Sequence, residues 1–276
     1  MEKKTALRHI DVMSAARMNG AIELVFGLII ALFVLLFSVL IGAVLPGFSR
    51  LIVGIGLVML ILIPIVLLFV GFLVAGFEAW VYNAIGSKIG YIKLTIKNNK
   101  LSWIDPDSAA RVGGAIGLVV GFFAGLVVMF AGIGAGNLLL ALFGLFGLVG
   151  FMLVFGVLMF AAFAAGALVY NYLVLKVGPI RLWFKGNALN EIDVVSYAKI
   201  SAVFGAIGGF VQGLVHTISS IFLLAFIPSA ASAVGLFAII VLPIATFIGA
   251  FVGAAIVGVL YNRLAPRIGG LELTIS

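Results

Sequence analysis

The residues that could carry chemistry are few, and most of them recur at fixed spacing. An aspartate followed three residues later by a serine and six residues later by a basic residue occurs at Asp11, Asp105 and Asp193. A tyrosine–asparagine pair also occurs three times, with the asparagines at Asn83, Asn171 and Asn262. Three such carboxylates or amides around an axis could form a polar ring at a pore mouth. Alternatively, these residues hold the fold: the Asp and Ser cap first helices, the Asn caps the second, and the Tyr joins an interfacial aromatic belt.

Four further polar residues occur once each within or beside apolar segments. Glu23 and Glu78 are candidates for an intramembrane site, because a carboxylate in lipid is costly and must find a partner. Both also lie close enough to the segment ends to reach the headgroup region. Gln212 and His216 stand four residues apart and so share a helix face. They could bind a small ligand, or simply hydrogen-bond a neighbouring helix.

Catalytic and metal-binding constellations are missing from the sequence. The chain has no cysteine and two histidines, and no nucleophile stands in a recognisable relation to a base. We therefore expect no enzymatic activity, no metal site and no cofactor. The formal charge of +7 does not indicate nucleic-acid binding, because the basic residues mark the ends of apolar segments rather than a continuous basic surface.

The composition requires a lipid environment for the elements that position these residues. Of 276 residues, 65% are apolar and 9% charged, and the mean hydropathy is +1.39. Residues 24–44, 51–77, 112–169 and 210–261 form long uncharged stretches, each sufficient for one or more crossings of about 20 residues. The sequence thus predicts a multi-pass protein of the cell membrane, with the lipid bilayer as its first partner.

The recurring motifs divide the chain into three copies of one unit, at residues 1–97, 98–185 and 186–276. Each unit reads as a short strand, a helix, a tight turn, a long helix and a second strand. The turns are expected at residues 45–50, 132–137 and 228–232, and the second helices at about residues 51–83, 138–171 and 233–262. The predicted fold is an all-α integral membrane protein with six transmembrane helices in three pseudo-threefold repeats, joined by short cytoplasmic β-hairpins.

The strands at the two ends of the chain lack a neighbour in sequence. Residues 91–97 alternate apolar and polar side chains and return after Asn98-Asn99, and residues 178–185 return after Gly186-Asn187. Residues 5–10 and 270–276 have no such partner. If the copies are arranged cyclically, these two strands pair, and six strands form a β cap under the helices.

The basic residues also predict the orientation of the chain. Fifteen of the sixteen Lys and Arg residues fall on the side of the hairpins, and Arg50 alone falls on the other. The positive-inside rule then places both termini in the cytoplasm. Glycines at 117, 121 and 125, and at 205, 209 and 213, recur every four residues and predict closely packed helices.

The motifs carry a family resemblance. The opening Asp-x-x-Ser-x-x-[Arg/Lys], together with Tyr261-Asn262 and Gly269-Gly270-x-x-Leu273, resembles a bacterial two-helix transmembrane domain of unknown function that is common in actinobacteria. That family usually has Trp where this chain has Met13, Asp107 and Val195. The resemblance implies two helices per unit and suggests that single-copy relatives assemble as trimers. It implies no activity.

Two functions follow as expectations. The first is a non-catalytic scaffold or interaction subunit whose cytoplasmic β cap binds another protein. The alternative is a channel or small-solute transporter along the pseudo-threefold axis, which the polar rings favour and the apolar helices oppose. The sequence leaves the oligomeric state open.

Overall fold

Helices and short strands alternate along the chain in the order that three copies of one unit require. The computed structural model describes residues 5–226 and 235–276. In chain order the elements are β1 (Thr5–Ile10), α1 (Val12–Val44), η1 (Pro46–Phe48), α2 (Ser49–Ile89), β2 (Lys93–Lys97), β3 (Lys100–Ile104), α3 (Pro106–Gly134), α4 (Leu138–Lys176), β4 (Ile180–Lys185), β5 (Ala188–Ile192), α5 (Val194–Phe226), α7 (Ala238–Ile268) and β6 (Leu271–Ile275). Each copy contributes a strand, two long helices and a second strand.

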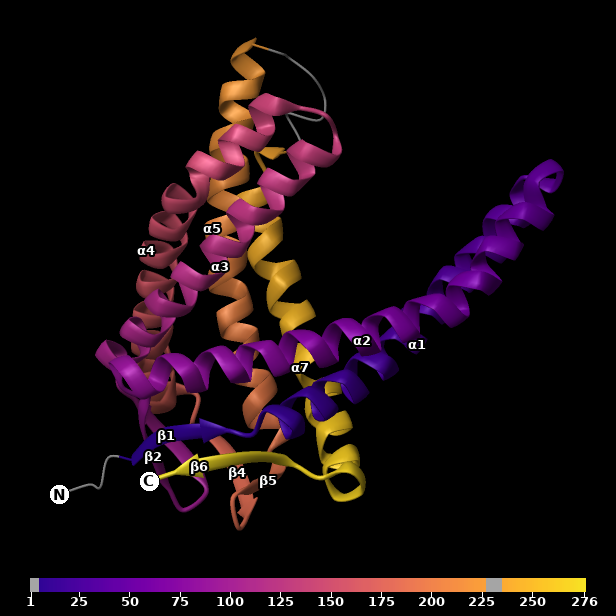
Figure 1. Cartoon of the computed structure of the whole chain (residues 1–276). Coiled ribbons are helices and arrows are strands. Elements are labelled where there is room, and N and C mark those ends of the chain that lie inside the picture. The colour runs from indigo at the N-terminus through magenta and orange to yellow at the C-terminus, as the bar shows by residue number, and fades with distance from the viewer. Residues whose placement is uncertain (1–4, 227–234) are drawn as a thin grey trace.

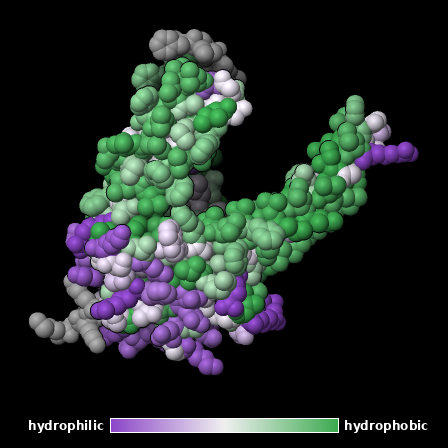
Figure 2. All heavy atoms as spheres, viewed as in Figure 1, coloured by the Kyte–Doolittle hydropathy of each residue, from purple (hydrophilic) through white to green (hydrophobic). Residues whose placement is uncertain are grey.

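Within the described residues, six helices are long and apolar enough to cross a membrane. They form three contacting pairs: α1 with α2, α3 with α4, and α5 with α7. Large apolar side chains such as Leu32, Phe37, Leu139 and Phe146 are exposed along them, which is stable only against hydrocarbon. Figure 2 shows this apolar surface over the helices and the hydrophilic surface around the strands. The chain is a multi-pass membrane protein.

The six strands of the described chain close into a barrel in the order β1-β2-β3-β4-β5-β6. The barrel lies at one end of the helices, and the α1–α2 pair leans away from the other two pairs (Figure 1). Residues 98–99 and 186–187 make the two-residue turns of the β2–β3 and β4–β5 hairpins, with positive φ at Asn98, Asn99 and Gly186, as such tight turns require.

The predicted pairing of the first and last strands is confirmed. Ile10 faces Leu273 across the β1–β6 ladder, just as Ile104 faces Leu94 and Ile192 faces Leu182 in the two hairpins. Each of these three ladders is interrupted by a register shift at the corresponding place. The junction of the two chain ends is therefore a third hairpin that lacks only its turn.

Glycines let the two helices of each pair approach closely, as their spacing predicts. A Cβ on Gly213 of α5 would lie 2.7 Å from the carbonyl oxygen of Ala238, and one on Gly27 of α1 would lie 2.6 Å from the Cα of Pro64. In the middle pair, Gly117 and Gly121 of α3 meet the backbone of α4 in the same way. This contact of a small residue with a backbone is the usual means of helix association in lipid. The first pair, in which the sequence shows no regular four-residue spacing, uses it too.

Neighbouring repeats meet next to the barrel. The residue seven positions after each capping aspartate is buried there: Met18 is 4% exposed, Val112 1% and Ile200 3%. Met18 packs with Leu189 and Tyr261, at the contact between repeats three and one. Ile200 packs with Tyr170, at the contact between repeats two and three. These two contacts between repeats thus lie at the barrel end of the helices.

The second helices continue to Ile89, Lys176 and Ile268, five to six residues beyond the predicted ends. The Tyr-Asn pair therefore lies inside each second helix and does not end it. The expected turn at residues 228–232 lies outside the described residues, whereas the turns at 45–48 and 135–137 lie where the sequence places them.

Candidate functional site: the helix–barrel junction

The repeated polar residues gather where the helices join the barrel, and the aspartates act as helix caps. A side-chain oxygen of Asp11 accepts the backbone N–H of Ser14 at 2.6 Å. Asp193 does the same for Ser196 at 2.6 Å, and Asp105 for Ser108 at 3.2 Å. Each aspartate stands immediately before its helix, in extended conformation at Asp11 and Asp105. The capping expectation is confirmed: each bond satisfies an amide that the helix start leaves free.

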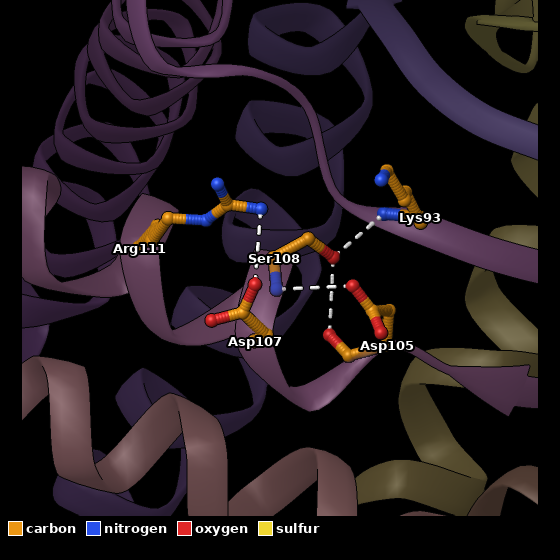
Figure 3. A network of polar contacts seen from close by, with 5 residues as sticks. All are labelled: Lys93, Asp105, Asp107, Ser108 and Arg111. Atoms are coloured by element: carbon orange, nitrogen blue, oxygen red, sulfur yellow. Dashed lines mark hydrogen bonds and ion pairs between the residues drawn. The ribbon is translucent and has the colours of Figure 1, made fainter.

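The serines connect one repeat to the next, which the sequence did not reveal. The hydroxyl of Ser108 donates to the carbonyl of Asp105 at 3.1 Å and accepts the N–H of Lys93 at 2.9 Å (Figure 3). The hydroxyl of Ser196 accepts the N–H of Arg181, and that of Ser14 accepts the N–H of Glu272, 258 residues away. Lys93, Arg181 and Glu272 are equivalent positions in the second strand of each repeat. The bond between Ser14 and Glu272 therefore links the third repeat back to the first and closes a ring of three repeats.

The tyrosines bridge the two strands within each repeat. The hydroxyl of Tyr170 donates to the carbonyl of Leu101 at 2.6 Å and accepts the N–H of Ile180 at 3.4 Å. Those two residues form the last paired rung between β3 and β4. The other tyrosines make the same two bonds: Tyr82 with Leu7 and Ile92, and Tyr261 with Leu189 and Leu271.

The asparagines complete the backbone pairing where the strands diverge toward their helices. Ile104 lies beyond the last β3–β4 rung, and its N–H and carbonyl both bind the side chain of Asn171, at 2.9 Å and 2.7 Å. Asn83 binds both backbone groups of Ile10, and Asn262 those of Ile192, in the same way. A partly buried backbone group without a partner would be costly, so the amide replaces the missing strand.

Two role assignments made from the sequence are therefore wrong. The asparagine does not cap the second helix, because it lies inside that helix and its side chain binds a strand. The tyrosine does not face lipid in an aromatic belt, because it is 4–5% exposed in all three copies and bound to strand backbone. In both cases the side chain binds backbone about 70 residues earlier, which a local motif does not specify.

The unrepeated polar residues do not form one site. Glu23 lies against Gly71 of α2, close to Asn19, whose amide donates to the Gly71 carbonyl at 3.0 Å. Glu78 lines a cavity whose walls come mainly from α2 and α3, with Ile10, Ala15, Met159, Phe163 and Leu271 completing the lining, and neither Gln212 nor His216 is among the lining residues. Gln212 and His216 are both exposed on α5. The sequence did not single out Asn19, the one side chain that ties α1 to the α2 backbone by a hydrogen bond in the described chain.

The outer surface of the barrel breaks the threefold symmetry in charge. Each repeat has one equivalent rung between its two strands: Ala6 with Lys93, Lys100 with Arg181, and Ala188 with Glu272. Of these three rungs, that of the second repeat places two charges of the same sign opposite each other, and Lys100 also faces Lys97 across the β2–β3 hairpin. Four exposed residues on β2, β3 and β4 form what we call the basic face: Lys93, Lys100, Arg181 and Lys185.

Comparison with known proteins adds no family to this description. Neither protein-family models, nor curated proteins, nor solved structures gave a match to the chain. The resemblance to the two-helix domain therefore rests on the sequence motifs alone. The three helix pairs and the closed barrel are features of the structure itself.

Proposed function

We propose that the protein is a non-catalytic membrane scaffold whose barrel lies in the cytoplasm and binds an acidic segment of another protein on its basic face. The rung between Lys100 and Arg181 carries this proposal. Like charges directly opposite each other destabilise a strand pair by about 0.2–1 kcal/mol. The equivalent rungs avoid this cost by having alanine on one side. A partner of negative charge bound at this rung would offset the repulsion between Lys100 and Arg181.

Lys100 and Lys185 flank the turns of the β2–β3 and β4–β5 hairpins, and the basic face extends over three neighbouring strands of the barrel. We assign this face to a protein partner, and we assign the basic residues near the starts of the helices, such as Arg17 and Lys199, to the headgroup region.

The alternative of a channel along the pseudo-threefold axis has no comparable support. In a pore, the repeated Asp and Asn residues would have to face water and ions. Here their side chains bind backbone groups at the helix starts and strand ends, in all three copies. Whether they also line an axial ring remains a prediction.

The repeat architecture suggests how such a scaffold arose. Each unit bonds to the next through the same serine, and the first and last units bond identically although no peptide links them. We infer that the chain is a fusion of three two-helix units that once formed a homotrimer, in line with the resemblance to the two-helix domain.

Replacing Lys100 with alanine tests the proposed function, because it copies the equivalent rungs. The protein is reconstituted in nanodiscs of zwitterionic lipid and titrated with a fluorescent peptide of glutamate and aspartate residues. We expect Lys100→Ala to raise the unfolding temperature and to weaken peptide binding, and added salt to weaken binding further. Arg263→Ala, on α7, is the matched control and should leave binding unchanged. Equal binding by wild type and Lys100→Ala would refute the basic face.

Orientation is tested separately. The chain has no cysteine, so single cysteines introduced at Asn99 and at Gly47 report on the two ends of the helices. In intact cells, a membrane-impermeant maleimide should label the Gly47→Cys variant and spare Asn99→Cys. The reverse pattern would place the barrel outside the cell and contradict the proposal.

A further inference from the structure

The three contacts between repeats differ at one pair of equivalent positions, and one contact contains a carboxylate beside a cavity. Between repeats three and one, Val257 of α7 packs in the cluster that contains Ile22 of α1. Between repeats two and three, α4 has Gly166 and α5 has the larger Phe204, whose ring lies 4.0 Å from where a Cβ on that glycine would be. In both contacts the side chains at these two positions are apolar.

Between repeats one and two, the equivalent residues are Glu78 of α2 and Ile116 of α3, and both line a cavity of about 710 Å³. This volume lies within the range of about 300–1,000 Å³ typical of small-molecule sites. Phe77, which also lines the cavity, contacts Phe123 of α3 edge to face at 5.5 Å between ring centroids. The two helices thus touch beside the cavity without filling it.

The lining is apolar except at Glu78 and Tyr82, and the Tyr82 hydroxyl is already bound to Leu7 and Ile92. In the described part of the chain, Glu78 has no hydrogen-bond or ion-pair partner. Leu73 and Val74, one turn deeper along α2, are exposed while lining the cavity. The cavity is therefore open to the bilayer, and its single charge is an unpaired carboxylate.

The depth of Glu78 matches the headgroup region. A crossing of about 20 residues counted from Arg50 ends about seven residues before Glu78. The same count places Leu73 and Val74 near the end of the crossing, and a crossing counted back from Gly134 at the end of α3 ends near Ile116. A molecule in the cavity would have its polar end near the carboxylate and its apolar end beside Leu73 and Val74.

From these observations we propose that the cavity binds one membrane phospholipid whose headgroup carries a primary ammonium group, such as phosphatidylethanolamine. An acyl chain occupies the apolar part between α2 and α3, and the ammonium pairs with Glu78. The carboxylate then has the opposite charge that its position at the membrane requires. This inference does not depend on the proposed scaffold function, because it concerns a different surface and a different ligand.

Native mass spectrometry of the delipidated protein in detergent tests the proposal, with phosphatidylethanolamine, phosphatidylcholine and phosphatidylglycerol of identical chains titrated one at a time. Wild type should bind one phosphatidylethanolamine more tightly than either other lipid. Glu78→Gln should weaken that binding by about fivefold, the upper end for a partly exposed ion pair. Glu191→Gln, an exposed carboxylate on β5, should leave it unchanged.

A second variant tests the cavity itself. Ile116→Phe introduces the residue that repeat three has at this position, so the fold should tolerate it, and the ring should compete with the acyl chain. We expect it to remove the specific phosphatidylethanolamine site, with an unfolding temperature at least equal to that of wild type. Two results would overturn the proposal: unchanged binding in Glu78→Gln, or phosphatidylglycerol binding wild type as tightly as phosphatidylethanolamine does.

Discussion

Replacing Asn171 by leucine should destabilise the protein far more than a change at a partly exposed position ordinarily does. The substitution nearly preserves side-chain size and removes both hydrogen bonds to Ile104, of 2.9 Å and 2.7 Å. Each backbone group left without a partner costs about 1–3 kcal/mol. Because the site is only partly buried, we expect a total loss of about 2–4 kcal/mol.

The loss can be measured as the free energy of unfolding in mixed detergent micelles, by titration with a denaturing detergent. Hydrogen exchange at the Ile104 amide should accelerate in parallel, because this amide loses its acceptor. Asn190→Leu, at an exposed asparagine of β5, is the matched control and should stay within about 0.5 kcal/mol of wild type. A loss below about 0.5 kcal/mol in Asn171→Leu would refute the role of the asparagine, and so would equal losses in the two variants.

The remaining predictions concern helix packing and the connection between repeats. Gly209→Ala should destabilise the α5–α7 pair, because its Cβ would lie 2.6 Å from the Leu242 carbonyl oxygen. The control Gly208→Ala meets nothing within 4 Å and should be neutral or stabilising by up to about 1 kcal/mol. The unfolding temperatures of the two variants test this difference. Ser108→Ala should cost about 1–2 kcal/mol through the lost bonds to Lys93 and Asp105, measured by the same detergent titration, and a neutral effect would count against the connection. Asp105→Asn keeps the capping oxygen and should change stability by less than about 0.5 kcal/mol.

Sequence patterns predicted the architecture well because they repeat. The spacing from Tyr to the glycine that follows the second helix is the same in all three units, and Gly90, Gly178 and Gly269 all adopt positive φ. Equivalent sequence implied equivalent structure, and the unpaired strands at the chain ends then implied closure. The membrane spans followed from composition alone.

The polar contacts were not predictable by the same means. Tyr170 and Asn171 both bind backbone groups of β3, 67–69 residues earlier, and any strand supplies the same N–H and carbonyl groups. No side-chain pattern in β3 therefore predicts that its backbone binds Tyr170 and Asn171. The cavity beside Glu78 is also invisible in the sequence, because its volume depends on how side chains from different helices, such as Ile116 of α3 and Phe163 of α4, pack around Glu78.

A disulfide across the two chain ends tests the central claim most directly, namely that three equivalent units close into a ring through β1 and β6. Ile10 and Leu273 face each other, and the backbone groups of Ile10 bind Asn83 instead. They therefore form a rung without mutual hydrogen bonds, the closer of the two kinds and suited to a disulfide. In the cysteine-free chain, the double variant Ile10→Cys/Leu273→Cys should cross-link within one molecule as completely as Leu94→Cys/Ile104→Cys, its equivalent in the β2–β3 hairpin. Cross-linking of the hairpin pair without cross-linking of the terminal pair would show that the ring is open.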